Sequence, residues 1–220
     1  MKDVLRFVRE KLGHDANDRF LFERALSHSS TGTDSYERLE FLGDRVLGHV
    51  IARWLFERFP DEPEGKLSRR YNALVARETC AEIGRDLGIP ALVKLGKQAR
   101  EDGASQSDNV VGDVVESLIG ALLLDGGFDA AEAFIRRAWV TYVEGQGRAP
   151  LHPKSALQEL AAARGCKAPV YETVARTGAH HAPRFTVRVS VPKLGEATAD
   201  GSSKQEAETA AAEALLNQLQ

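Results

Sequence analysis

The sequence predicts two domains, an all-α domain followed by a smaller α+β domain with the element order αβββα. Residues 1–145 show apolar positions at helical spacing, interrupted by glycine and proline. After a segment rich in glycine and proline, the pattern changes to that of a helix, three short strands and a second helix. We therefore expect domains at 1–145 and 153–220, joined by a linker at 146–152.

The first domain is expected to contain helices near 3–12, 18–27, 35–58, 66–87, 89–95, 106–124 and 128–144. Breaks are expected at Gly13, Pro60 to Gly65, Gly88, Gly103 and the Asp125-Gly126-Gly127 turn. These residues interrupt helices because proline lacks an amide donor and glycine favours turn conformations.

The second domain is expected to begin with a helix that Pro153 opens and Gly165 closes. Strands are expected at 170–177, 184–191 and, more briefly, near 196–199. In the second strand, apolar residues alternate and lie on one face. Gly201-Ser202-Ser203 then indicates a helix start, and an alanine-rich helix is expected to run to about Gln218.

Composition predicts a cytoplasmic protein without a membrane partner. At 220 residues and 43% hydrophobic content, the chain is long enough to bury a sizeable core. Its apolar runs are shorter than the roughly 18 residues that a membrane span needs, and its N-terminus is charged and amphipathic rather than signal-like. Cys80 and Cys166 fall in different domains without metal-like spacing, so we expect free thiols in a reducing compartment.

Four carboxylates lie in pairs on two otherwise apolar stretches. Glu40 and Asp44 share a helical stripe with Glu37, whereas Asp113 and Glu116 are the only charges between residues 110 and 124. Buried carboxylates without partners cost several kcal/mol each, so their clustering predicts a divalent cation between the two helices. Oxygen ligands without a nearby His or Cys favour Mg²⁺ or Mn²⁺ over Zn²⁺.

Other interpretations of these acids are weaker. Acidic pairs at helical spacing are common on solvated helix faces, but the apolar flanks argue against that interpretation here. A carboxylate-bridged metal oxidase would place a His three residues after a ligand Glu. Gly43 and Ile119 occupy those positions. The isolated His14, His28 and His49 are expected to be structural.

Several motifs resemble a known family. Residues 36–45, Tyr-Glu-Arg-Leu-Glu-Phe-Leu-Gly-Asp-Arg, resemble the signature of the bacterial ribonuclease III family. Residues 112–121, Gly-Asp-Val-Val-Glu-Ser-Leu-Ile-Gly-Ala, resemble its second acidic helix, and residues 25–30 and 64–69 are further matches. The segment 153–220 resembles a double-stranded RNA-binding domain. The resemblance covers almost the whole chain and implies an all-α ribonuclease III endonuclease domain followed by an RNA-binding domain.

The resemblance also implies roles for single residues, carried over by position. The metal-binding and catalytic residues would be Glu40, Asp44, Asp113 and Glu116, with Glu37 and Glu64 as auxiliary acids. Phe41 would lie at a dimer interface, with a plain core position as the alternative. RNA contacts would come from Gln158, Glu159, His181, Ser203 and Lys204. The chain departs from the family pattern at Tyr36, Arg45, Lys66, Gln205 and Glu206.

The implied activity is Mg²⁺-dependent hydrolysis of double-stranded RNA, leaving 5′-phosphate and 3′-hydroxyl ends with short 3′ overhangs. A homodimer with one site per subunit and no nucleotide cofactor is implied, as are ribosomal RNA precursors and structured messenger RNAs as substrates. The alternative is a non-catalytic RNA-binding regulator, and the complete set of four acids argues against it.

Charge adds one expectation about RNA binding. Residues 152–220 carry 8 Lys+Arg and 7 Asp+Glu, which is a net charge of +1. The whole chain has a net charge of −3, so the remaining residues have a net charge of −4. RNA-binding proteins are usually more basic. We therefore expect weak or salt-sensitive RNA binding by the second domain alone.

Overall fold

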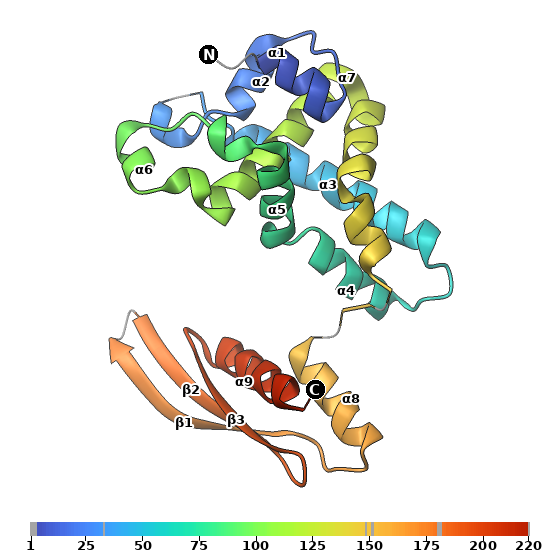
Figure 1. Cartoon of the computed structure of the whole chain (residues 1–220), viewed down its shortest axis with the longest axis vertical. Helices are drawn as coiled ribbons and strands as arrows, with labels where there is room; N and C mark the ends of the chain where they lie inside the picture. Colours follow the sequence, from blue (N-terminus) through green and yellow to red (C-terminus); the bar gives the residue numbers. More distant parts are fainter. Residues whose placement is uncertain (1–3, 33, 148, 151, 180–181, 220) are drawn as a thin grey trace. The chain divides into compact units, whose positions relative to one another are not determined.

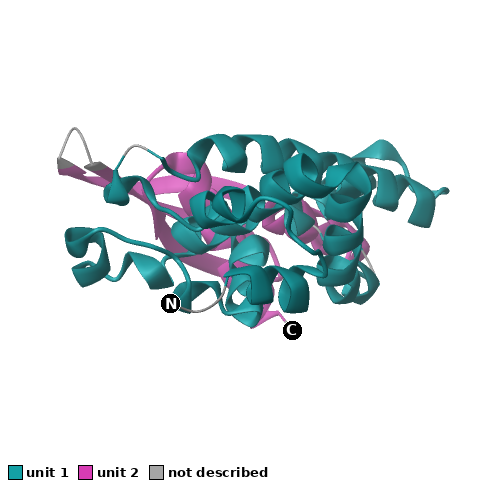
Figure 2. Cartoon of the chain, turned by 90° about the horizontal axis from the view of Figure 1, so that it is seen from above, with its two compact units in different colours: residues 1–150 teal, residues 151–220 magenta. Residues whose placement is uncertain are grey.

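The computed structural model describes residues 4–32, 34–147, 149–150, 152–179 and 182–219 (Figure 1). The chain divides into two compact units, residues 1–150 and 151–220 (Figure 2). In the described part of the first unit the only β-type pairing is an isolated bridge between Ser27 and Lys94. The second unit has a sheet and two helices, so the expected fold class is confirmed.

The first unit consists of helices α1 (Val4–Phe7), α2 (Arg19–Ala25), α3 (Glu37–Arg58), α4 (Glu64–Leu74), α5 (Arg77–Leu87), α6 (Lys97–Glu101) and α7 (Asp108–Gly145). A π-helical turn (Val8–Leu12) continues α1, and short 3-10 turns lie at Ser29–Thr31, Ile89–Ala91 and Ala104–Gln106. Gly127 is non-helical inside α7, with φ 77° and ψ −179°, which places a break at the predicted Asp125-Gly126-Gly127 turn.

Two expectations for this unit were wrong in detail, and one further helix was not expected. The helix expected at 66–87 is two helices, because the chain becomes extended at Ala76 and the Leu74 carbonyl accepts a hydrogen bond from Trp139 Nε1 (2.8 Å). The helix expected at 89–95 is only a 3-10 turn, after which Lys94 pairs with Ser27. Helix α6 was not predicted. Contacts between residues far apart in the sequence cause the first two differences, and such contacts cannot be predicted from a local sequence pattern.

Helices α3 and α7 form the centre of the unit, and they touch backbone to backbone at two glycines. A Cβ placed on Gly43 would lie 1.7 Å from the Glu116 carbonyl oxygen, and one placed on Gly120 would lie 2.3 Å from the Leu39 carbonyl oxygen. Only glycine permits so close an approach. Around this crossing the two helices bury Leu39, Leu47, Val50, Ile51, Val114, Leu118 and Leu122.

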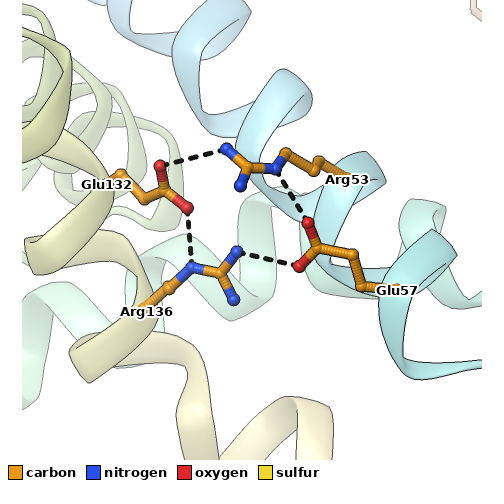
Figure 3. Close-up of polar contacts among 4 residues, drawn as sticks. All are labelled: Arg53, Glu57, Glu132 and Arg136. Carbon is orange, nitrogen blue, oxygen red and sulfur yellow. Dashed lines mark hydrogen bonds and ion pairs between the residues drawn. The ribbon is translucent and has the colours of Figure 1, made fainter.

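A ring of four charged side chains joins α3 to the second half of α7 (Figure 3). Arg53 Nε donates to Glu57 (2.8 Å), and Arg136 Nε donates to Glu132 (2.7 Å). Across the helices, Arg53 reaches Glu132 at 3.5 Å and Arg136 reaches Glu57 at 3.3 Å. Each arginine therefore contacts one glutamate on its own helix and one on the other helix.

The second unit contains α8 (Pro153–Ala163), β1 (Val170–Ala179), β2 (Ala182–Val191), β3 (Gly195–Gly201) and α9 (Lys204–Gln218). The strands form an antiparallel sheet in the order β1-β2-β3. Its core includes the side chains of Leu157, Ala161, Val189, Val191, Ala211, Ala212 and Leu215. The αβββα order predicted from the sequence is confirmed.

Two predictions about the whole chain can be compared with the structure. Cys80 is buried in the first unit and Cys166 is partly buried in the second, and both are free. Among the described residues, every helix is too short or too polar to pass through a lipid bilayer.

Candidate active site

One pocket of about 360 Å³ brings together the four acids that the sequence singled out. Glu40 and Asp44 come from α3, one helical turn apart, and Asp113 and Glu116 come from α7 at the same kind of spacing. The pocket is also lined by Phe41, Arg45, Val75, Arg77 and Gly112. The acids meet because α3 and α7 approach closely at Gly43, next to the α3 pair.

Burial disfavours the charged forms of Glu40, Asp113 and Glu116. Burial is the main cause that raises the pKa of Glu40 to about 7 and that of Glu116 to about 8, and the neighbouring carboxylates raise both further. Burial also raises the pKa of Asp113, although a hydrogen bond from the Tyr36 hydroxyl to Asp113 Oδ2 (3.3 Å) opposes that rise. The charged forms of Glu40 and Glu116 are therefore less stable in the pocket than in water.

Two arginines lie at this pocket. Arg45 forms an ion pair with Asp44, and its guanidinium lies over the Phe41 ring at 5.3 Å from the ring centroid. Arg77 begins α5 and favours the charged forms of Asp113 and Glu116. Arg77 and Val75 were not identified from the sequence, because a continuous helix was expected at 66–87.

The donor set of the pocket matches a hard divalent cation. Its acidic lining offers carboxylate oxygens, and no His or Cys is among the residues that line it. A cation would offset the repulsion that raises the pKa values of Glu40 and Glu116. Within the described ranges, no three Asp, Glu, His or Cys side chains already converge as ligands. Instead, Asp44 contacts Arg45 and Asp113 accepts from Tyr36.

The predicted auxiliary and interface residues take different places. Glu37 and Glu64 are not among the residues that line the pocket. They accept hydrogen bonds from Ser35 Oγ (3.1 Å) and Ser68 Oγ (2.6 Å), respectively. Phe41 lines the pocket and is 65% exposed, so its alternative interpretation as a core residue was wrong.

Four of the five predicted RNA contacts lie at the surfaces of α8 and α9. Gln158 and Glu159 are exposed on α8. Ser203 caps α9, where its hydroxyl accepts from the Glu206 amide, and the Lys204 side chain is 62% exposed. His181 lies outside the described residues.

The carboxylate of Glu206 accepts hydrogen bonds from donor groups at the start of α9. It accepts hydrogen bonds from both the amide and the hydroxyl of Ser202. These hydrogen bonds lower the pKa of Glu206. The acidic residue at position 206 therefore places a hydrogen-bond acceptor at this helix end.

Comparison with known proteins gives consistent matches over both units. Residues 18–143 match the family model described as ribonuclease-III-like, and residues 153–219 match the double-stranded RNA binding motif. Ribonuclease 3 from Zymomonas mobilis is 57% identical over 215 residues, covering 98% of this chain and 87% of that protein. Ribonuclease 3 from Rhodopseudomonas palustris is 45% identical over 214 residues, covering 95% and 79%.

A solved structure supports the same relationship for the first unit. The nuclease domain of ribonuclease III from Campylobacter jejuni is 30% identical and superposes with a TM-score of 0.60, covering 65% of this chain and 98% of that domain. The acid pocket lies within the segment that the ribonuclease-III-like model matches. The chain therefore belongs to the ribonuclease III family and is a double-stranded-RNA-specific endoribonuclease.

Proposed function

We propose that this chain cleaves double-stranded RNA by Mg²⁺-dependent phosphodiester hydrolysis in the pocket between α3 and α7. The metal ligands and catalytic residues are Glu40, Asp44, Asp113 and Glu116, and Mn²⁺ is a substitute ion. The observation that carries the proposal is that these four carboxylates, from two separate helices, line one pocket. Water adds to phosphorus while the bond to the 3′ oxygen breaks, which leaves a 5′-phosphate and a 3′-hydroxyl.

The chain's own residues hold and orient the reacting groups. The four carboxylates supply oxygen ligands, and the contact of Gly43 with α7 fixes the spacing between the α3 pair and the α7 pair. The Tyr36 hydroxyl donates to Asp113 and orients that carboxylate. Arg77, like Arg45, adds positive charge to a pocket that four acids line, which favours approach of an RNA phosphate. When bound, Mg²⁺ supplies activation of water and stabilisation of the charge that develops on the leaving oxygen.

We propose that the working form is a homodimer with Phe41 at its interface. Phe41 is a large apolar side chain that is 65% exposed beside the pocket, which favours burial against a second copy. The description of the Campylobacter jejuni structure refers to a region involved in dimer formation in that protein. One site per subunit allows both RNA strands to be cut, and the offset between the cuts leaves short 3′ overhangs.

The second unit binds the RNA duplex in this proposal. Its contacts are Gln158 and Glu159 on α8, His181, and Ser203 with Lys204 at the start of α9. Such domains recognise A-form RNA by shape, through ribose hydroxyls and phosphates. We assign the catalytic domain to 1–145, the linker to 146–152 and the RNA-binding domain to 153–220.

Auxiliary roles for Glu37 and Glu64 rest on the family resemblance, because neither residue lines the pocket. The hydrogen bond of Glu64 with Ser68 and the electrostatic effect of Glu37 on Glu40 are the contacts through which these acids would act. Ribosomal RNA precursors and structured messenger RNAs in the cytoplasm are the proposed substrates. No nucleotide cofactor is part of the proposal.

The test is a gel assay with end-labelled duplex RNA, matched single-stranded RNA and duplex DNA, each with Mg²⁺ or with chelator. We expect cutting of duplex RNA alone, only with the metal, and products that carry 5′-phosphate ends. Binding of duplex RNA without cutting under both Mg²⁺ and Mn²⁺ would contradict the proposal and favour the non-catalytic RNA-binding regulator.

A further inference from the structure

We propose that Arg45 is a positioning residue that acts through Asp44. Its guanidinium serves as an internal counter-ion, which a divalent cation displaces from the Asp44 carboxylate when it enters the pocket. This inference rests on the proposed metal site and deepens it. It predicts that the residue at position 45 sets the metal concentration at which the site fills.

The ion pair is built by α3 alone. Asp44 and Arg45 are consecutive, and consecutive side chains on a helix point in different directions, so the long Arg45 side chain has to turn back to reach its neighbour. Phe41 lies one helical turn before Arg45, and its ring supports the guanidinium at 5.3 Å from the ring centroid. All three residues line the pocket.

Asp44 differs from the other three acids in its partner. In the described part of the chain, it is the one acid of the four that forms an ion pair with a cationic side chain. Asp113 accepts from the neutral Tyr36 hydroxyl. The positive charge that a metal would bring to the pocket is thus already present at Asp44, in the form of Arg45.

Displacement of the Arg45 guanidinium from Asp44 by a metal has an energetic cost. A carboxylate oxygen held by Arg45 is not free to ligate a metal, and the displaced guanidinium stays tethered next to the incoming cation. The Arg45 side chain is 67% exposed and that of Asp44 is 37% exposed, so solvent screens the pair and its effect is modest. We therefore expect neutralisation of Arg45 to tighten metal binding by about fivefold.

The inference is tested by direct metal binding to the full chain without RNA. Titration with Mn²⁺, followed by the electron paramagnetic resonance signal of the free ion, gives the dissociation constant independently of cleavage. Arg45→Gln removes the charge and keeps most of the length, whereas Arg45→Lys keeps the charge. Arg58→Gln is the matched control, because it makes the same charge change on the same helix, roughly 20 Å away and beyond the Debye length of about 8 Å.

The expected result is that Arg45→Gln binds Mn²⁺ about fivefold more tightly than the unmodified chain, while Arg45→Lys and Arg58→Gln bind with unchanged affinity. The difference should shrink as KCl is added, because the pair is partly exposed. Equal or weaker binding by Arg45→Gln would overturn the inference and leave the metal site intact. If Glu116→Gln leaves Mn²⁺ binding unchanged, the metal site itself is contradicted, and the inference falls with it.

Discussion

Gly43 and Gly120 lie opposite each other where α3 crosses α7. A Cβ on Gly120 would lie 3.3 Å from the Gly43 amide nitrogen, and one on Gly43 would lie 2.9 Å from the Gly120 amide nitrogen. Gly43 directly precedes Asp44, and Gly120 lies one helical turn after Glu116. This contact therefore sets the distance between the two pairs of acids, and the site depends on residues without side chains.

Gly43→Ala tests that dependence. The new Cβ would lie 1.7 Å from the Glu116 carbonyl oxygen, so α3 and α7 have to move apart. We expect a loss of about 3 kcal/mol in the free energy of unfolding. A displacement of roughly 1 Å at the acids should also slow cleavage by about a hundredfold. Denaturant unfolding and the duplex-cleavage assay measure the two effects.

Gly145→Ala is the matched control for that substitution. Gly145 ends α7, and a Cβ there would meet nothing within 4 Å. Stability and cleavage should stay close to those of the unmodified chain. If Gly43→Ala behaved like Gly145→Ala, the close crossing would not be what positions the acids.

The stability of the metal-free protein should fall as the pH rises. The pKa values of Glu40, about 7, and Glu116, about 8, exceed the ordinary glutamate value of 4.5, so the folded state holds these protons more tightly than the unfolded state. Their contribution to stability is therefore greatest below the ordinary value and is lost as the pH rises to about 8. Thermal unfolding in chelator, between about pH 5 and pH 8, measures the fall.

The double variant Glu40→Gln with Glu116→Gln is the control for this pH dependence. It removes both titrating groups, so most of the decrease in unfolding temperature should disappear. Metal should have a similar effect on the unmodified chain, because a bound cation favours the charged carboxylates. An identical decrease in the double variant would show that other groups cause it.

Lys204→Ala tests the RNA-binding surface. The Lys204 side chain is 62% exposed at the first residue of α9, and its nearest acid, Glu208, lies 3.9 Å away. Loss of a phosphate contact should weaken binding by a similar factor for unrelated duplexes and reduce the salt dependence by about one unit of slope. Fluorescence anisotropy over a KCl series measures both. Lys167→Ala is the matched control, and an equal loss in that variant would mean that total charge, not position, matters.

Glu132→Gln tests the ring of charges between α3 and α7. The Glu132 side chain is 17% exposed and forms ion pairs with both Arg53 and Arg136. We expect a loss of about 1 kcal/mol in the free energy of unfolding at low salt, and a smaller loss at high salt. Urea unfolding at two KCl concentrations measures it. The exposed Glu144→Gln, on the same helix, is the control, and a salt-independent loss would point to packing instead.

The sequence predicted much of this fold because helical and strand periods are visible in the apolar residues. The acids on α3 and α7 were identifiable for the same reason: spacings of three and four residues fix a helix face, and the apolar neighbours indicate burial. Gly120 lies four residues after Glu116 and therefore on the same helix face. That a glycine on α3 meets it depends on the crossing of the helices, which the spacing does not reveal.

Other features required the structure. The break between α4 and α5 has no glycine or proline, and a hydrogen bond from Trp139, 65 residues after Leu74, satisfies the end of α4. This break brings Arg77 to the pocket. The ion pair of Asp44 with Arg45 was equally hidden, since adjacent residues on a helix usually point apart.

The most direct test of the acid pocket as a metal-dependent nuclease site compares Glu116→Gln with Glu144→Gln. Cleavage of labelled duplex RNA in Mg²⁺ and binding of the same duplex in chelator are measured side by side. We predict that Glu116→Gln cleaves at less than about 1% of the unmodified rate and binds RNA with unchanged affinity, while Glu144→Gln matches the unmodified chain in both. Substantial cleavage by Glu116→Gln would contradict the assignment of this pocket as the active site.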